Sequence, residues 1–144
     1  MKYAFYGSDT PAIFPTDAAF ADVGDQRRLY DLLSEVWSAA TCAPRLRGEW
    51  SPRNKTLGQC SVTSFLVQDI YGGEVYGVPL VTGGYHCYNV VNGVRFDLTS
   101  EQFGGETLVY DDRYPQSREE HFADREKYAR YVLLKEGLLK KIRR

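Results

Sequence analysis

Several features of membrane-bound, secreted and nucleic-acid-binding proteins are missing from this sequence. No stretch approaches the apolar length of a membrane span, and the start, MKYAFYGSDTPAIFP, lacks the basic stretch and unbroken apolar run of a secretory signal. The formal net charge of -1 supplies no overall field that would draw the chain onto nucleic acid or an anionic membrane. We therefore expect a cytoplasmic protein whose partners include neither nucleic acid nor a membrane.

Cysteine is also scarce, with three residues at irregular spacing and no CxxC pair. Such a set argues against a disulfide framework and leaves at least one thiol free. A zinc site at Cys60, His86 and Cys87 is disfavoured, because neighbouring residues of a strand project to opposite faces and no fourth ligand has the usual spacing. We expect no metal and no other cofactor.

Aromatic and aliphatic residues, in contrast, are plentiful. The 144 residues include 11 Tyr and 7 Phe, and 43% of the chain is hydrophobic, which is typical of a globular protein. A chain of this length can bury a core without disulfides or a structural metal, so we expect one domain over residues 1–144. Residues 1–24 are rich in aromatic side chains but lack a clear period, which favours an irregular N-terminal arm.

Hydrophobic periodicity predicts three helices. Apolar residues recur at helical spacing from Asp25, a typical N-cap, to Ala40, and again from about 118 to 141. The segment 60–71 is apolar on nearly every side and stops at a double glycine, which favours a buried central helix, although its β-branched residues leave a strand possible. Residues 41–58 combine Pro, Gly and Arg and are typical of a long loop.

An antiparallel sheet is expected after the central helix. The strand-like segment EVYGVPLV is followed by YHCYNVV and VRFDL, and the dipeptide Asn92-Gly93 between the last two is the strongest short-range hairpin signal. A two-residue turn at this dipeptide sets Val91 opposite Val94. Counting outward from this pair sets Tyr88 opposite Asp97.

This register predicts which side chains share a face of the hairpin. One face carries four polar or aromatic residues: His86, Tyr88, Asp97 and Thr99. Asp97 is a diagonal neighbour of His86, at an expected Cβ separation of about 7 Å or less, so a carboxylate and an imidazole can meet there. The other face carries Cys87 among apolar residues and is expected to be core, with Cys87 pointing away from Cys60.

Cys60 lies at the expected start of the central helix, where unpaired backbone N–H groups and the helix dipole favour a thiolate over a thiol. A nucleophile at a helix start, a base on a neighbouring strand and a carboxylate on the next strand are the parts that covalent acyl chemistry requires. The pattern therefore predicts a catalytic site of Cys60, His86 and Asp97. Taken singly, each has a simpler explanation as a buried hydrophobe, a structural histidine or a turn cap.

Three parts of the chain resemble a known family. The segments GQCSVTSFLVQDIYGGEV and GYHCYNVVNGVRFDLTSEQF and the closing helix look like the YunG-type family of small bacterial proteins, over most of residues 50–135. That family is similar in layout to the papain-like and NlpC-like cysteine peptidase superfamily. There, cysteine opens a central helix, and histidine and a polar partner lie on successive strands.

The resemblance implies a fold and a set of roles. The fold would be α+β and papain-like, with N-terminal helices, a buried central helix packed on an antiparallel sheet, and a closing C-terminal helix. Cys60 would be the nucleophile, His86 the general base and acid, and Asp97 the residue that orients the imidazole.

Papain relatives often place a glutamine six residues before the cysteine to help hold the oxyanion, and this chain departs from that pattern. The position holds Asn54, while Gln59 adjoins Cys60. The Cys60 backbone N–H is one natural donor, and Gln59 ranks slightly ahead of Asn54 as the second. Gln59 has an equally simple explanation as a helix-start residue that faces solvent.

The expected function is that of a cysteine hydrolase or acyltransferase acting on a small amide, peptide or related acyl substrate through an acyl-enzyme on Cys60. The alternative is a binding or accessory module that keeps the same scaffold without turnover. Trp50, Tyr85 and Tyr88 are candidates to line the cleft, although core packing explains aromatic residues as well. His121 is expected to be a solvated surface residue. Substrate identity and oligomeric state are left open.

Overall fold

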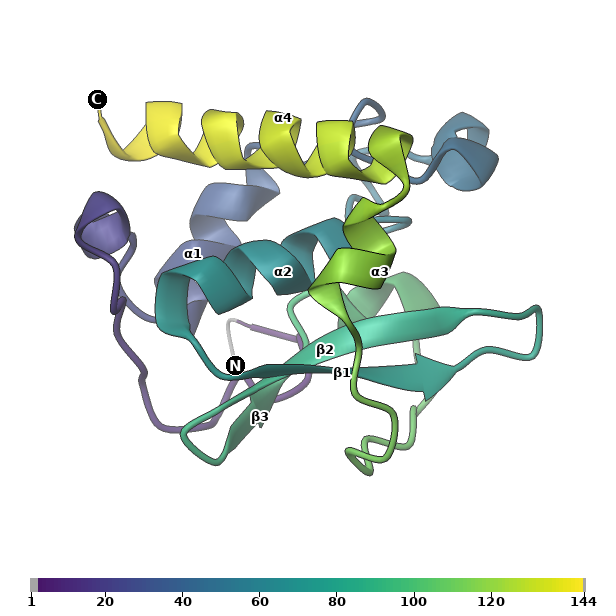
Figure 1. Ribbon diagram of the computed structural model, residues 1–144, viewed down its shortest axis with the longest axis horizontal. Coiled ribbons are helices and arrows are strands. Elements are labelled where there is room, and N and C mark those ends of the chain that lie inside the picture. Colours follow the sequence, from purple (N-terminus) through teal and green to yellow (C-terminus); the bar gives the residue numbers. More distant parts are fainter. Residues whose placement is uncertain (1–2, 144) are drawn as a thin grey trace.

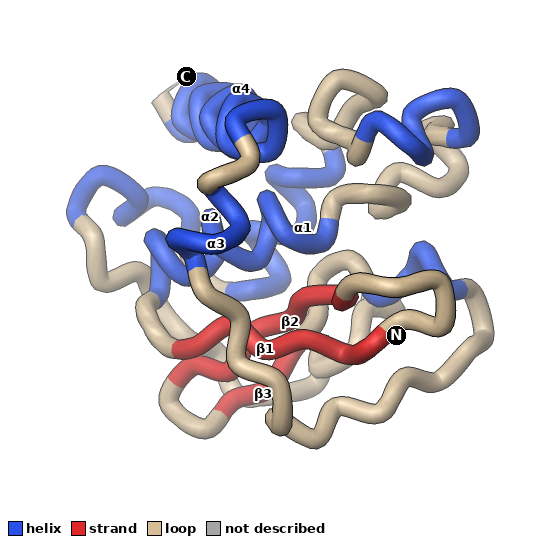
Figure 2. Tube along the Cα trace, turned by 45° about the vertical axis from the view of Figure 1, so that its right-hand side comes forward, coloured by secondary structure: helices blue, strands red, loops and turns tan. Residues whose placement is uncertain are grey.

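Four α-helices lie on one side of a three-stranded antiparallel sheet in the computed structural model, which describes residues 3–143 (Figures 1 and 2). The α+β class expected from the sequence is confirmed. The helices are α1 (Gln26–Ser34), α2 (Cys60–Tyr71), α3 (Arg118–Phe122) and α4 (Arg125–Ile142), and the strands are β1 (Glu74–Pro79), β2 (Tyr85–Val91) and β3 (Val94–Phe96). Three short 3-10 helices are η1 (Ala18–Val23), η2 (Pro44–Glu49) and η3 (Ser100–Phe103).

Helix α2 is the central element of the fold. It lies between α4 and the sheet and packs against both (Figure 1). Its buried residues come from all around the helix, which explains why the sequence shows no single apolar stripe: Val62, Thr63, Ser64, Phe65, Leu66, Val67, Ile70 and Tyr71. The prediction of a buried helix over 60–71 is confirmed. The helix ends at Gly72, whose φ of 81° favours glycine.

The predicted hairpin forms with the expected register. Val91 pairs with Val94 across the turn, and Asn92 and Gly93 have φ angles of 51° and 78°, as a type I′ turn requires. Strand β2 is the middle strand of the order β1-β2-β3. Both sheet edges are covered in part, because Asp97 bridges to Tyr6 beyond β3 and a later segment bridges to β1.

The first predicted helix is shorter than expected. Asp25 caps it by accepting from Arg28 N, as predicted, but α1 ends at Ser34 instead of near Ala40. The residues after it turn inward, and the buried Trp37 donates from Nε1 to Thr63 Oγ1 of α2 at 3.0 Å. The apolar residues after Ser34 fit the helical spacing in the sequence, but a turn and not a helix brings them into the core.

The predicted C-terminal helix is two helices. It breaks at Asp124, whose extended backbone and side chain cap α4 by accepting from Glu126 N and Lys127 N. An aspartate inside an amphipathic pattern was the available signal for this break. The N-terminal arm is more ordered than expected, because it contains η1 and buries Phe5 and Phe20 in the core.

Candidate active site

His86 and Asp97 form a buried pair at the open end of the β2–β3 hairpin. His86 Nε2 donates to Asp97 Oδ2 at 2.6 Å, and both side chains are 1% exposed. His86 lies on β2, and Asp97 follows the last residue of β3. The Asp97 backbone N–H donates to Tyr6 O at 2.9 Å, so the N-terminal arm helps to hold this carboxylate in place.

Two further residues hold the Asp97 carboxylate from its other sides. Thr99 donates to Oδ1 from its backbone N at 3.1 Å and from Oγ1 at 3.3 Å. Tyr110 donates from its hydroxyl to Oδ2 at 2.7 Å. The ring of Phe103 packs on the His86 imidazole at 4.7 Å and 88°. These contacts fix both the carboxylate and the imidazole plane, as a rigid proton-transfer site requires.

Cys60 is the first residue of α2 and is partly exposed to solvent. The side chain of the N-cap residue, Gln59, makes no capping hydrogen bond, so no side chain of the cap competes for the N–H groups of the first turn. The Cys60 thiol interacts with the His86 ring. Because Nε2 is bonded to Asp97, and the buried Nδ1 has no hydrogen-bond partner within residues 3–143, Nδ1 is the ring atom available to the sulfur.

The charges of this group favour an ion pair. A hydrogen bond from Cys87 lowers the pKa of Cys60 well below its ordinary value and, with His86, outweighs burial. Burial opposes the imidazolium, but Asp97 and Cys60 raise the pKa of His86 to about 10. A lowered thiol pKa beside a raised imidazole pKa places a thiolate next to an imidazolium at neutral pH.

The prediction that Cys87 points away from Cys60 is wrong. Cys87 lies fully buried in the hydrophobic core, as expected for its face of the hairpin. Helix α2 covers that same face, however, and the thiol of Cys87 interacts with that of Cys60. Cys60, at the start of α2, therefore interacts with both His86 and Cys87, which project from opposite faces of β2.

The structure does not offer the Gln59 side chain to an oxyanion. Gln59 is fully buried, and its Nε2 donates to Ser38 O at 3.0 Å. It therefore neither faces solvent nor reaches toward a substrate of Cys60. The preceding Gly58 has φ of 71°, and a Cβ there would lie 2.5 Å from Cys42 Sγ, so the chain turns into α2 at a site that requires glycine.

The other residues predicted to touch a substrate lie apart from Cys60 or inside the core. Asn54 lines a cavity of about 160 Å³ to which neither Cys60 nor His86 contributes. Trp50 donates from Nε1 to Lys55 O at 3.0 Å within its own loop. Tyr88 is fully buried and donates to Asp112 Oδ1 at 2.6 Å, so it does not line an open cleft.

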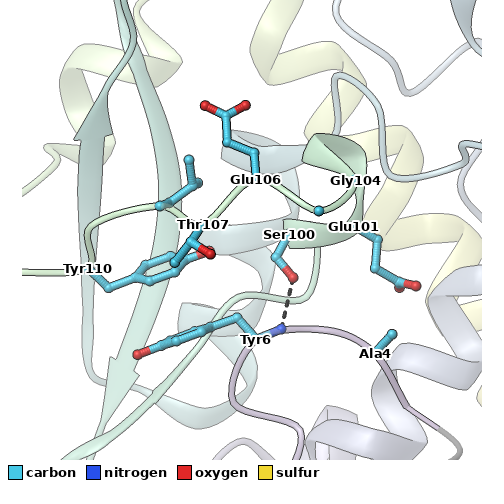
Figure 3. Close-up of a pocket in the computed structure, with 10 residues that line it drawn as sticks. Ala4, Tyr6, Ser100, Glu101, Gly104, Glu106, Thr107 and Tyr110 are labelled. Carbon is cyan, nitrogen blue, oxygen red and sulfur yellow. Dashed lines mark hydrogen bonds between the residues drawn. The ribbon is translucent and has the colours of Figure 1, made fainter.

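A larger cavity, of about 450 Å³, is lined by Tyr110, whose hydroxyl donates to the Asp97 carboxylate (Figure 3). Tyr6 and Tyr110 stack there at 3.9 Å, and Glu101 and Glu106 also line it. Figure 3 shows the Ser100 hydroxyl bonded to the Tyr6 backbone N. Cys60 and His86 do not line the cavity, which contacts the candidate site through Tyr110 and through Tyr6, whose carbonyl accepts from the Asp97 backbone N–H.

The expectation that His121 is a solvated surface residue is wrong. It is half-buried against the Phe65 ring at 5.0 Å, and its Nε2 donates to Gln116 Oε1 at 2.9 Å. Lys127 donates to its Nδ1 at 2.9 Å, and burial together with this ammonium lowers the pKa of His121. His121 is thus a neutral structural residue near the Cys60 thiol, with which it interacts electrostatically.

Three contacts of the site were missing from the sequence-based prediction. The bond from Thr99 N to Asp97 Oδ1 has a local signal, because aspartate commonly accepts from the backbone two residues on. Tyr110 lies in a loop whose sequence has no hydrophobic periodicity, so no sequence pattern predicts its hydrogen bond to Asp97. The Cys60–Cys87 contact depends on which sheet face α2 covers, which spacing alone does not determine.

Two kinds of feature are absent from the described residues. Within residues 3–143, no group of three or more His, Cys, Asp or Glu side chains is arranged to hold a metal ion. In the same range, every helix is too short or too polar to cross a bilayer.

Comparison with known proteins identifies the family. The model of the family described as YunG protein matches residues 25–143. A protein of Bacillus subtilis (strain 168), described as "Uncharacterized protein YunG", is 36% identical over 93 residues, which are 65% of this chain and 74% of that protein. No solved structure matches. Since the family model covers most of the chain, including Cys60, His86 and Asp97, the chain belongs to the YunG family.

Proposed function

We propose that this chain is a cysteine hydrolase or acyltransferase that acts on a small amide, peptide or related acyl compound through an acyl-enzyme on Cys60. One observation carries the proposal: His86 is bonded to Asp97 at 2.6 Å through Nε2, while the ring interacts with a thiol at the start of a buried helix. Nucleophile, base and orienting carboxylate are the three parts of covalent acyl transfer by cysteine.

In the first step, the Cys60 thiolate attacks the substrate carbonyl carbon. Asp97 keeps the proton on Nε2 and holds the ring, so Nδ1 is the nitrogen that exchanges protons. The imidazolium gives its Nδ1 proton to the leaving amine as the tetrahedral intermediate collapses to a thioester. In the second step, His86 takes a proton from water or another acceptor at Nδ1, and that acceptor displaces the acyl group from sulfur.

The oxyanion of the intermediate needs donors near the sulfur. The backbone N–H of Cys60 belongs to the first turn of α2, where N–H groups have no partner inside the helix. The Gln59 side chain is bonded to Ser38, so the proposal does not use it. The positive end of the α2 dipole favours the same negative charge.

The arrangement also supports the proposal that the fold is papain-like. A cysteine opens the central helix, the helix packs on an antiparallel sheet, and histidine and carboxylate come from successive strands. Fold alone does not identify a reaction, so the functional proposal depends on the side-chain geometry.

The proposal predicts a covalent acyl group on Cys60. Reduced protein is mixed with a panel of activated acyl esters and peptide anilides, quenched in acid, and measured by intact mass and peptide mapping. We expect an adduct on Cys60, loss of the adduct in Cys60→Ser, and its retention in Cys42→Ser, because Cys42 is fully buried and its thiol has the Ala43 carbonyl as partner. Adding a primary amine then distinguishes transfer from hydrolysis by the product released.

Wild-type protein that accepts no acyl group from the panel, or that is acylated equally in Cys60→Ser, would contradict the proposal. The binding or accessory module would then be the better description of this chain. The Cys42→Ser control also shows whether loss of any thiol, rather than of Cys60 in particular, disturbs the fold.

A further inference from the structure

The proposed acyl-transfer chemistry leaves one buried nucleophile without a role. Cys87 is fully buried on β2, directly after His86, and its thiol interacts with that of Cys60. The remaining cysteine, Cys42, lies in the loop before α2 and has the Ala43 carbonyl as its hydrogen-bond partner at 3.5 Å. Two of the three thiols therefore meet at the candidate nucleophile.

The way α2 lies along β2 supports this contact independently. Asn89, which shares a face with Cys87, donates from Nδ2 to Ser64 O at 2.9 Å. Ser64 is one helical turn beyond Cys60, about 6 Å along the helix axis. Asn89 is about 7 Å beyond Cys87 along the strand. Helix α2 and β2 run in the same direction, because Gly73, after the end of α2, lies against Val90 and Val91 at the end of β2. The two steps therefore match, and the contact of Asn89 with the second turn of α2 brings Cys87 beneath the first turn.

The surroundings make the two thiols unequal. Cys60 is partly exposed and has the lowered pKa, so it is the sulfur that an oxidant in solvent meets as a thiolate. The hydrogen bond to Cys60 and burial raise the pKa of Cys87 well above its ordinary value, so Cys87 stays protonated and protected. A low-pKa thiolate beside a second cysteine is the arrangement of a redox-sensitive pair.

We propose that Cys60 and Cys87 form a peroxide-sensitive dithiol, in which oxidation of Cys60 is followed by closure of a Cys60–Cys87 disulfide that blocks the nucleophile reversibly. The inference rests on the proposed function for the reactivity of Cys60. It adds a modification site, with a hydroperoxide as the reagent, and a partner residue for it.

The chemistry balances with a hydroperoxide as the only oxidant. The Cys60 thiolate attacks the outer oxygen, the O–O bond breaks, and the departing oxygen takes a proton from the His86 imidazolium to leave as water or an alcohol. Cys60 is now a sulfenic acid. The Cys87 sulfur attacks the Cys60 sulfur, the S–O bond breaks, and hydroxide leaves with the Cys87 proton as water. The two thiols lose two electrons, which the hydroperoxide gains.

The experiment treats reduced full-length protein with hydrogen peroxide, blocks the remaining thiols with an alkylating reagent, and maps peptides by mass. We expect a Cys60–Cys87 disulfide that dithiothreitol reverses, with Cys42 still reduced. Cys42→Ser should form the same disulfide. In Cys87→Ser and Cys87→Ala, irreversible oxidation of Cys60 to sulfinic acid should be faster by about tenfold, because no second thiol captures the sulfenic acid.

Two results show whether the dithiol or the proposed function is wrong. If Cys60 accepts acyl groups but oxidises to sulfinic acid without a disulfide, or pairs with Cys42, the dithiol is overturned and the proposed function stands. If the Cys60–Cys87 disulfide forms but Cys60 never accepts an acyl group, the dithiol stands and the enzyme proposal falls. Cys87→Ser is polar and Cys87→Ala is apolar, so an effect that both variants share comes from loss of the thiol and not from a packing defect in one of them.

Discussion

In His86→Gln, we expect the rate of Cys60 alkylation by iodoacetamide to rise more steeply with pH than in wild type, by up to about tenfold per pH unit wherever the thiol is mostly protonated, because the variant lacks the imidazolium that lowers the thiol pKa. The reason is the proton equilibrium of the thiol. Wild-type Cys60 has a pKa well below its ordinary value, because Cys87 and His86 both stabilise the thiolate. Without the imidazolium, the thiolate fraction follows pH.

The slope against pH is a sharper measurement than the rate at one pH, because a thiolate of lower pKa is also a weaker nucleophile. His121→Gln is the matched control: it removes the other of the two histidines, which is also half-buried near the thiol but is neutral. We expect its profile to match that of wild type. A profile in His86→Gln that is no steeper than that of wild type would show that His86 does not set the charge of Cys60.

In Asp97→Asn, we expect the free energy of unfolding at neutral pH to fall by about 3–5 kcal/mol, the usual cost of leaving one partner of a buried charge pair unpaired. The Asp97 carboxylate accepts from His86, Tyr110 and twice from Thr99. The asparagine side chain has one acceptor oxygen, whereas the carboxylate has two. Its NH₂ group must therefore face at least one of the donors that the carboxylate accepted from. Urea unfolding measures the loss.

The same variant should change how stability depends on pH. Cys87 and His86 lower the folded-state pKa of Cys60 below its ordinary value of 9.0. The contribution of Cys60 to the free energy of unfolding therefore grows as pH rises from that lowered pKa to 9.0. Burial lowers the folded-state pKa of His86, but Asp97 outweighs burial and raises this pKa from 6.5 to about 10. The contribution of His86 to the free energy of unfolding is therefore full below pH 6.5 and is lost as pH rises toward 10. The opposite slopes cancel over the pH range in which both groups change charge, up to pH 9.0.

We therefore expect the stability that this pair gives the wild-type protein to stay level below pH 9.0, where the two slopes cancel, and to fall between pH 9.0 and about 10. Asp97→Asn should flatten this profile, because Cys60 is then left to oppose the effect of burial on the imidazolium without the Asp97 carboxylate. Asp111→Asn is the control, since that carboxylate is exposed and bonds only the Arg113 backbone N. Equal losses in both variants would show that Asp97 has no special role.

Much of the framework that holds the site was predictable from local patterns. Helix α2 begins at Cys60 and stops at Gly72, as the apolar run and the double glycine indicate. The Asn92-Gly93 turn sets the β2–β3 register, and this register brings His86 to Asp97. Both features depend on residues close together in the chain, where turn chemistry and periodicity are informative.

The errors concern contacts between distant segments. Cys87 was placed away from Cys60 because strand alternation was used without knowing that α2 covers the core face of β2. Gln59 was ranked as an oxyanion donor from adjacency, but Ser38, in the turn after α1, takes its amide. Such contacts depend on how helices pack on a sheet, and a single sequence does not encode that in any short-range pattern.

The central claim is that Cys60 is a thiolate paired with the His86 imidazolium in the resting protein, and an ultraviolet titration measures the thiolate directly. The thiolate absorbance of reduced wild-type protein is followed from alkaline to acid pH, and the titration of Cys60→Ser is subtracted. We predict that the Cys60 thiolate is already present at neutral pH and persists well below pH 9.0. A thiolate that appears only as the pH approaches 9.0, the ordinary value of a cysteine, would contradict the account.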